Sequence, residues 1–233
     1  MAGWLRALAS RVRRARQATS DGALAREEDP LRTPGCSPSS LRRCCERAPG
    51  SFACTWKRLF DGGVDGAAIG DLVGRPGATL EDSLRTLFPE IERRPFVDRE
   101  VRYDGPLTFR FRDVPEYEVE RPIDWADDRF GHRGARLWLQ NLSWVDRVYK
   151  DGGTAAAAYV IVDWADRALF ADPPYELTWD DHAVAARPAR TWRFFDRYVQ
   201  EEVLNVRVLH ACARIFLTHV YALATDDCYT PWH

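Results

Sequence analysis

The sequence lacks the cysteine spacing of a zinc site or of a disulfide framework. Its six cysteines include no Cys-x-x-Cys pair, and four of them fall within residues 36–54. Structural zinc sites use closely spaced pairs of Cys and His, whereas disulfide-rich secreted domains distribute their cysteines throughout the fold. We therefore expect reduced thiols, and we predict neither a metal site nor a cofactor.

Lysine and long apolar runs are also scarce. Only Lys57 and Lys150 are lysines, so nearly all of the 33 basic residues are arginines, and the formal net charge is −2. Coding composition alone produces such a bias, and we do not predict nucleic-acid binding from it. No apolar run reaches the roughly 18 residues that a membrane-spanning helix needs. The sequence thus predicts no integral membrane span.

Residues 1–54 have the composition of a tail. Residues 1–17 contain five arginines and no acid, with Trp4, Leu8 and Val12 at helical spacing. The arginines interrupt the apolar stretch that a secretory signal requires, which leaves a mitochondrial-type presequence, a membrane-surface anchor or a frayed terminus. Residues 18–51 are dense in turn-forming residues. We predict disorder over 1–54 and leave the localisation open.

Short elements are predicted over residues 55–122. Amphipathic pieces at 55–60 and 80–88 flank a Gly-rich segment, and Thr79 followed by Asp82 is a loose capping signal for the second piece. Apolar and charged residues alternate over 96–119, and strictly so over 109–113, which predicts a β-hairpin. We place its turn at the Asp-Gly-Pro sequence of residues 104–106.

From residue 123 onwards the apolar period becomes 3.6, which predicts four helices. They span about 137–149, 155–169, 180–198 and 203–223. Asp-Gly-Gly at 151–153 separates the first two, and Asp-Pro-Pro at 172–174 precedes the third. Helices joined by short loops pack as antiparallel hairpins. The sequence therefore predicts a mainly α fold, divided into segments 1–54, 55–122 and 123–233.

Residues 178–187 combine an aromatic ring, two carboxylates, an imidazole and a guanidinium. A tryptophan face such as that of Trp179 stacks on sugars, and Asp180 or Asp181 can cap the following helix. Arg187 can bind a carboxylate with two parallel hydrogen bonds. The alternative is structural: the Asp caps, the Trp packs on the core, and His182 and Arg187 make internal hydrogen bonds.

Pro188 decides how these side chains can be oriented. A proline inside a helix removes a backbone hydrogen bond, so either the helix kinks or a short turn over 180–187 precedes it. On an unbroken helix His182 and Arg187, five residues apart, project about 140° from each other. They would then not point into the same pocket.

Further candidates lie on the other predicted helices. Asn141 and Trp144 are three residues apart and share a helix face, so they are candidates for sugar contacts, with a core position as the alternative for Trp144. His210 and His219 are flanked by apolar residues, and we interpret both as packing histidines. His132, between glycines, is predicted in a loop.

Several tryptophan-containing blocks together carry a resemblance to a known family. They are Pro122-Ile-Asp-Trp125, Trp138-Leu-Gln-Asn-Leu-Ser-Trp144, Val162-Asp-Trp164, Trp179-Asp-Asp-His-Ala-Val-Ala-Ala-Arg187 and Asp227-Cys-Tyr-Thr-Pro-Trp-His233. In order and spacing they resemble the N-terminal helical region of the heparinase II/III-like, or alginate-lyase-like, polysaccharide lyases. The resemblance extends from about Phe109 to the end of the sequence.

The resemblance implies an incomplete (α/α) toroid of antiparallel helix hairpins, followed in the family by a β-sandwich domain. Family members usually work in the periplasm or outside the cell, and they cleave acidic, uronate-containing polysaccharides by β-elimination. A tyrosine or histidine removes the C5 proton while a neighbouring Asn, His or Arg stabilises the developing charge. The implied partner is an acidic polysaccharide, facing Trp179, His182, Arg187, Asn141 and Trp144.

One departure from the family pattern concerns catalysis. An Asn-His-Gly segment follows the family's counterpart of residues 229–233, with the catalytic tyrosine further on, and this sequence ends at His233. We therefore assign no catalytic residue and expect an N-terminal fragment, a truncated reading frame or a degenerate member, inactive by itself. The alternative is a non-catalytic helical module that binds a glycan or a protein. The oligomeric state stays open.

Overall fold

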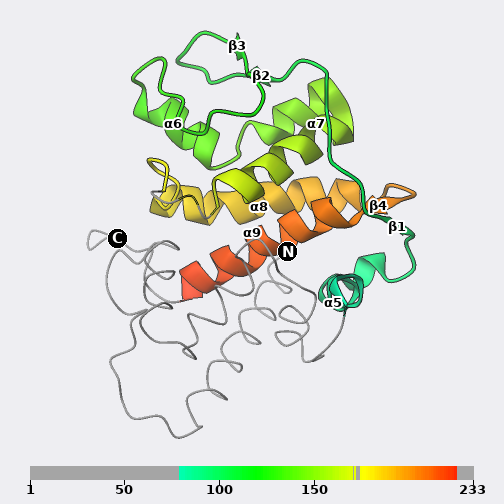
Figure 1. Cartoon of the computed structure of the whole chain (residues 1–233). Helices are drawn as coiled ribbons and strands as arrows, with labels where there is room; N and C mark the ends of the chain where they lie inside the picture. Colours follow the sequence, from blue (N-terminus) through cyan, green and yellow to red (C-terminus); the bar gives the residue numbers. More distant parts are fainter. Residues whose placement is uncertain (1–78, 170, 172–173, 225–233) are drawn as a thin grey trace, which may run out of the picture. The chain divides into compact units, whose positions relative to one another are not determined.

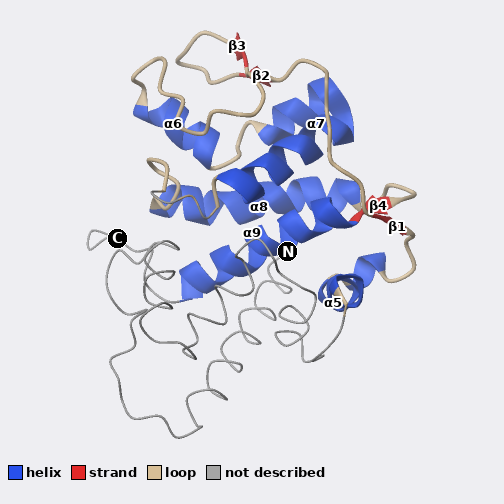
Figure 2. Ribbon diagram, viewed as in Figure 1, coloured by secondary structure: helices blue, strands red, loops and turns tan. Residues whose placement is uncertain are grey.

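The computed structural model describes residues 79–169, 171 and 174–224. These residues are mainly helical, as predicted, and the few strands are two residues long (Figure 2). The predicted tail over 1–54, the piece at 55–60 and the closing block at 227–233 lie outside the described residues. Within the described part no helix is both long and apolar enough to cross a membrane.

The chain divides into two compact units, and the larger one is Arg93–His219. The other unit contains residues 79–92, where helix α5 (Leu80–Leu87) is followed by a 3₁₀ turn, η2 (Pro89–Ile91). The predicted capping signal is confirmed there. The Thr79 side chain accepts a hydrogen bond from the Asp82 N–H, and the Asp82 side chain accepts one from the Thr79 N–H.

The strands of the larger unit do not follow the predicted hairpin. Antiparallel β2 (Thr108–Phe109) and β3 (Tyr117–Glu118) do form one, but its connection is residues 110–116. The predicted turn at 104–106 was wrong. The alternation over 109–113 does not mark a long strand. Strand β2 ends at the buried Phe109, and the chain then turns, with the Val114 N–H bonded to Phe111 O.

Helix α6 (Arg133–Gln140) and helix α7 (Val145–Arg167) replace the first two predicted helices. A turn over 141–144, in which Leu142 has φ 60°, interrupts the predicted helix 137–149. The predicted break at 151–153 corresponds to Gly153, whose φ of 71° and ψ of −164° are not helical. These dihedrals divide α7 into two helical pieces, which suits a glycine.

Helix α8 (Asp181–Tyr198) and helix α9 (Val206–Ala224) confirm the last two predictions. Helix α8 continues through Pro188, so the alternative of a separate short turn over 180–187 is wrong. The short connection between α8 and α9 reverses the chain direction (Figure 1). Aromatic pairs join the two helices: the ring centroid of Phe216 lies 5.8 Å from that of Trp192 and 6.0 Å from that of Phe195.

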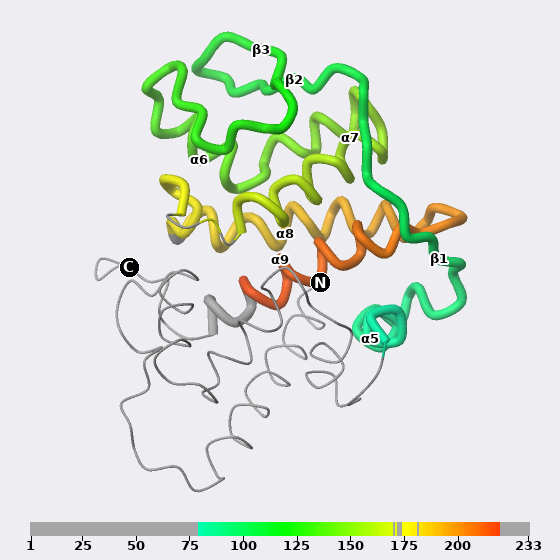
Figure 3. The backbone as a smooth tube through the Cα atoms, in the orientation of Figure 1, coloured from blue at the N-terminus to red at the C-terminus, as the bar shows by residue number. Residues whose placement is uncertain are grey.

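An extended segment runs along the larger unit before reaching β2 (Figure 3). It begins with β1 (Phe96–Val97), which pairs in parallel with β4 (Leu204–Asn205) just ahead of α9. The Asn205 side chain also donates a 2.8 Å hydrogen bond to Arg99 O. The core between these elements contains the fully buried rings of Trp125, Trp144 and Trp164.

Candidate functional site: the rim between helices α6 and α8

Arg187 is fully buried at the centre of the helical unit. Its Nε donates to Gln140 O at 2.8 Å, and its Nη2 donates to Thr178 O at 2.8 Å. Its Nη1 contacts Nε2 of His219, and the guanidinium carbon lies 4.0 Å from the centre of the Trp164 ring. The side chain therefore fixes the ends of α6 and of the loop before α8 to the core, and the prediction that it faces a sugar was wrong.

The Arg187 contact also fixes the tautomer of His219. Because a guanidinium can only donate, Nε2 of His219 accepts, and Nδ1 carries the proton that it donates to Ile215 O at 2.7 Å. Burial, and then the charge of Arg187, hold the pKa of His219 well below its ordinary value. His219 is thus a neutral, fully bonded packing histidine, as the sequence suggested.

Gln140 connects this cluster to two tryptophans. Its Nε2 donates to Trp125 O at 2.6 Å, while its Oε1 accepts from Thr178 Oγ1 at 3.1 Å and from the Trp164 indole at 3.4 Å. The Trp125 indole in turn donates to Asp163 at 2.7 Å. A buried polar network of this kind specifies one arrangement of its helices, because each broken bond leaves a desolvated group.

Trp179 is held in place by this network and stays half-buried at the surface. Its ring stacks on the ring of His219, with centroids 5.6 Å apart and planes inclined by 25°. The supporting imidazole is itself fixed by its two hydrogen bonds. Trp179 is therefore a pre-oriented aromatic surface at the start of α8.

Asp180 caps α8 and joins it to α6. Its carboxylate accepts from the His182 N–H at 3.1 Å, which satisfies a free donor of the first turn, and pairs with Arg133 at 2.8 Å. Arg136 makes a parallel connection to Glu176 at 3.2 Å. The side chains of Arg133 and His182 are 65% and 67% exposed. We call this surface the α6–α8 rim; it consists of Arg133, Arg136, Glu176, Trp179, Asp180 and His182.

The predicted site residues separate into two groups. Trp179 and His182 lie on the rim, whereas Arg187, Asn141 and Trp144 are at most 7% exposed. Asn141 ends α6 and accepts from the Ser143 N–H at 2.9 Å, and Trp144 packs against Phe109 and Trp125. Sugar contacts for Asn141 and Trp144 were wrong predictions, because both side chains are enclosed in the structural core.

Sequence reasoning missed the basic side chains that α6 brings to Trp179. His132 caps α6, accepting from the Ala135 N–H at 3.2 Å, rather than lying in a free loop. That cap begins the helix so that Arg133 reaches Asp180, 47 residues further on, and Arg136 reaches Glu176, 40 residues further on. The available signal was an unremarkable pair of arginines three residues apart on a short amphipathic helix.

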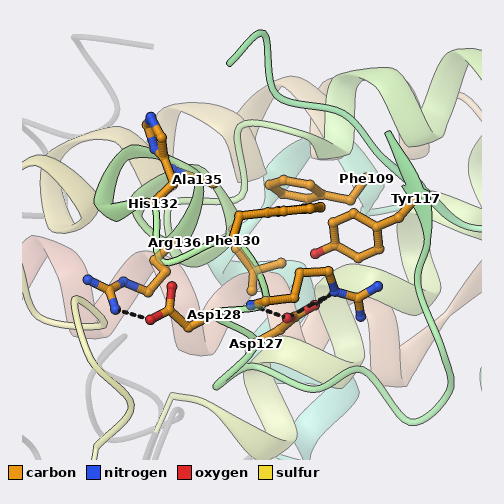
Figure 4. Close-up of a pocket in the computed structure, with 10 residues that line it drawn as sticks. Phe109, Tyr117, Asp127, Asp128, Phe130, His132, Ala135 and Arg136 are labelled. Atoms are coloured by element: carbon orange, nitrogen blue, oxygen red, sulfur yellow. Dashed lines mark hydrogen bonds and ion pairs between the residues drawn. The ribbon is translucent and has the colours of Figure 1, made fainter. Parts of the chain in front are cut away.

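A small aromatic pocket lies beside the first turn of α6 (Figure 4). Phe109, Tyr117 and Phe130 form its apolar wall, and Arg129 stacks 3.7 Å from the Tyr117 ring centre. Burial and the neighbouring Asp127 raise the pKa of Tyr117, so its hydroxyl stays protonated. The cavity measures about 10 Å³, which is room for one water and excludes a sugar.

A larger hollow of about 400 Å³ lies near the C-terminal end of α8. Among its lining residues are Arg99, Arg102, Thr154, Tyr198 and Asn205, and none of the predicted site residues lines it. In the part of the chain that the structure describes, no group of three His, Cys, Asp or Glu side chains is placed to hold a metal ion.

No family model, curated protein or solved structure matches this chain. The interpretation of the site therefore depends on its own geometry and on the resemblance of the tryptophan blocks.

Proposed function

We propose that this chain is the N-terminal helical region of a heparinase II/III-like polysaccharide lyase and that the α6–α8 rim binds acidic, uronate-containing polysaccharide. The observation that carries the proposal is the placement of Trp179. A fixed, half-buried ring stands at the start of α8 with the exposed side chains of Arg133 and His182 near it. An acidic sugar presents an apolar ring face and a carboxylate, and these are the two groups that such a surface accommodates.

An anionic ligand can compete with the acidic side chains of the rim for binding to the rim arginines. The side chain of Arg133 is 65% exposed, and its pair with Asp180 lies at the surface, where ion pairs contribute little stability. Arg136 is only 22% exposed and is shared between Asp128 and Glu176. A uronate carboxylate can therefore replace the acidic partner of Arg133 at small cost. His182 adds a further donor when its ring faces the ligand.

The helix order supports the finer proposal of an incomplete (α/α) toroid. Helices α7, α8 and α9 follow one another in the chain, and α8 packs against both α6 and α7. The helix hairpins of a toroid need this arrangement. In the proposed protein the β-elimination itself depends on the family's Asn-His-Gly segment and catalytic tyrosine, so this region supplies polysaccharide binding.

The proposal is tested by titrating fluorescently labelled alginate and heparan sulfate oligosaccharides into the full chain and into two variants. Replacing both Arg133 and His182 by Ala should weaken binding about fivefold to tenfold, since two exposed polar contacts together contribute about 1 kcal/mol. The matched control is Arg112→Ala, which removes an exposed arginine paired with its neighbour Asp113. Absence of binding by the unaltered chain, or equal loss in the control, would contradict the proposal.

An absorbance assay on the same samples tests whether this chain cleaves its ligand. Cleavage by β-elimination leaves an unsaturated uronate, whose ultraviolet absorbance rises with time. The proposed function expects rim-dependent binding without a rise in absorbance, because the family's catalytic residues are not in this region, and a rise would contradict that assignment. Binding that the rim variant leaves unchanged removes the rim from the proposed binding site.

A further inference from the structure

Three arginines of α8 converge on one carboxylate of α7. Arg190 and Arg193 approach Asp146 Oδ2 at 3.5 Å and 3.2 Å, and Arg197 approaches Oδ1 at 3.3 Å. Each arginine reaches Asp146 through a single Nη1 atom, so none forms the two parallel bonds of a strong guanidinium–carboxylate pair. We call Arg190, Arg193 and Arg197 the arginine stripe.

The stripe carries more positive charge than Asp146 neutralises. The side chains of Arg190, Arg193 and Arg197 are 27%, 56% and 40% exposed, and Asp146 is 27% exposed. Asp196 lies at the edge of the same face, and in the described residues its carboxylate forms no ion pair with the stripe. Three guanidinium groups sharing one weakly held carboxylate leave donors available for another anion.

Helix geometry aligns the stripe with the rim. The helix is continuous from Asp181 to Tyr198, and at 3.6 residues per turn His182 and the three arginines fall within a sector of about 80°. Ala186 lies within this sector and is half-buried, and the half-buried Ala189 and exposed Ala185 lie beside the sector; we call these three residues the alanine face. The rise along α8 from His182 to Arg190 is about 12 Å, and that from Arg190 to Arg197 is about 10 Å. One polymer lying along α8 can thus contact both the rim and the arginine stripe.

The arginines are also constrained in orientation. The guanidinium carbon of Arg197 lies 4.7 Å from the centre of the Tyr149 ring, a cation–π contact from α7. Asp146 lies in the first turn of α7, where the helix dipole stabilises a carboxylate without any arginine. Both the stripe and its counter-ion are therefore supported from α7, and an incoming anion meets an already arranged set of donors.

We propose that the arginine stripe is a second anion subsite, where a carboxylate or sulfate of the same acidic polysaccharide displaces Asp146. This inference rests on the proposed function, because it assigns a further sugar unit of one bound chain to α8. The polysaccharide then extends from Trp179 and His182 along the alanine face to Arg193 and Arg197. A short oligosaccharide occupies the rim alone, and a longer one gains the stripe.

Two variants with opposite expected effects test the subsite. Replacing Arg193 and Arg197 together by Ala should weaken binding of a long alginate or heparan sulfate oligosaccharide about tenfold, with little change for a disaccharide. Asp146→Asn removes the competing carboxylate and should strengthen binding of the long ligand about threefold. If the ion-pair cluster is purely structural, Asp146→Asn should leave binding of the long ligand unchanged or weaken it.

The control is Arg207→Ala, which removes an exposed arginine paired with Asp98 away from the stripe. Circular dichroism of each variant verifies that it folds. If the unaltered chain binds no acidic oligosaccharide, the proposed function itself fails. If it binds, but the arginine variant matches the control or Asp146→Asn fails to bind more tightly, only the second subsite is overturned.

Discussion

Arg187 shows at the scale of one residue how a chemically promising side chain can be structural. Its guanidinium bonds to Gln140 O, Thr178 O and His219, which lie 47, 9 and 32 residues away in sequence. A buried arginine is exceptional, because removing a charge from water is costly unless its donors are satisfied. Pattern analysis assigns an arginine to the surface by default, and only the fold reveals these three acceptors.

We expect Arg187→Ala to destabilise the protein by about 3 kcal/mol or more, because it leaves two buried carbonyl groups and an imidazole without their donor. Chemical denaturation followed by tryptophan fluorescence measures the loss. The comparison is Arg207→Ala, whose exposed pair with Asp98 should contribute less than about 1 kcal/mol. Equal stability of the two variants would show that the Arg187 cluster is not structural.

His182 and Trp179 were predictable at the same scale for a physical reason. The Asp180 cap fixes where α8 begins, and the continuous helix places His182 and Arg187 about 140° apart, so that one faces outward and the other inward. Arg133 was not predictable, since its approach to Asp180 spans 47 residues and depends on how α6 packs. Local signals therefore identified one side of the rim and missed the other.

Among the elements, the turn between α6 and α7 illustrates the limit of periodicity. The apolar pattern continues through residues 137–149, but Asn141 bonds to the Ser143 N–H and Leu142 adopts a positive φ. Packing of Trp144 against Phe109 and Trp125 favours this turn over a continuous helix. The predicted position of the hairpin was wrong for a similar reason: its register depends on tertiary packing of Phe109 against Tyr117.

Helix α7 depends on glycine at residue 153. With φ 71° and ψ −164°, this backbone conformation is costly for any residue that carries a Cβ atom. We expect Gly153→Ala to lower the free energy of unfolding by roughly 1–3 kcal/mol, measured by thermal or urea denaturation.

Gly131 provides the comparison for that variant. It also has a positive φ, 59°, and, as at Gly153, an added Cβ would meet no atom within 4 Å. Because asparagine tolerates left-handed backbone, Gly131→Asn should change stability by less than about 1 kcal/mol. A larger loss at Gly131 than at Gly153 would contradict the assignment of backbone strain to α7.

For the whole molecule, the fully buried His219 and the half-buried His210, both neutral in the folded state, make stability depend on pH. Burial, and then the charge of Arg214, lower the pKa of His210 to about 4, and the pKa of His219 is also lowered. In the unfolded chain the pKa values of both histidines return towards 6.5. Below that pH the unfolded state binds more protons than the folded state, so stability is present above pH 6.5 and is lost as the pH falls towards 4.

The free energy of unfolding, measured by denaturation, should therefore be lower at pH 4.5 than at pH 7.5, and His210 should contribute roughly 2 kcal/mol of that difference. His210→Gln removes the titrating group and should reduce the loss by about that amount. Carboxylates contribute equally to the wild type and to the variant, so the difference between the two isolates the imidazole. Identical pH profiles would contradict a half-buried, neutral His210.

The parallel pairing of β1 with β4 has a consequence for the synthesis of the chain. Phe96 pairs with Leu204, and Arg207 forms an ion pair with Asp98. The segment that starts the larger unit thus obtains its partners only after residue 207 has left the ribosome. Until then β1 presents an unpaired edge, and the nascent unit cannot complete its structure step by step as its helices emerge.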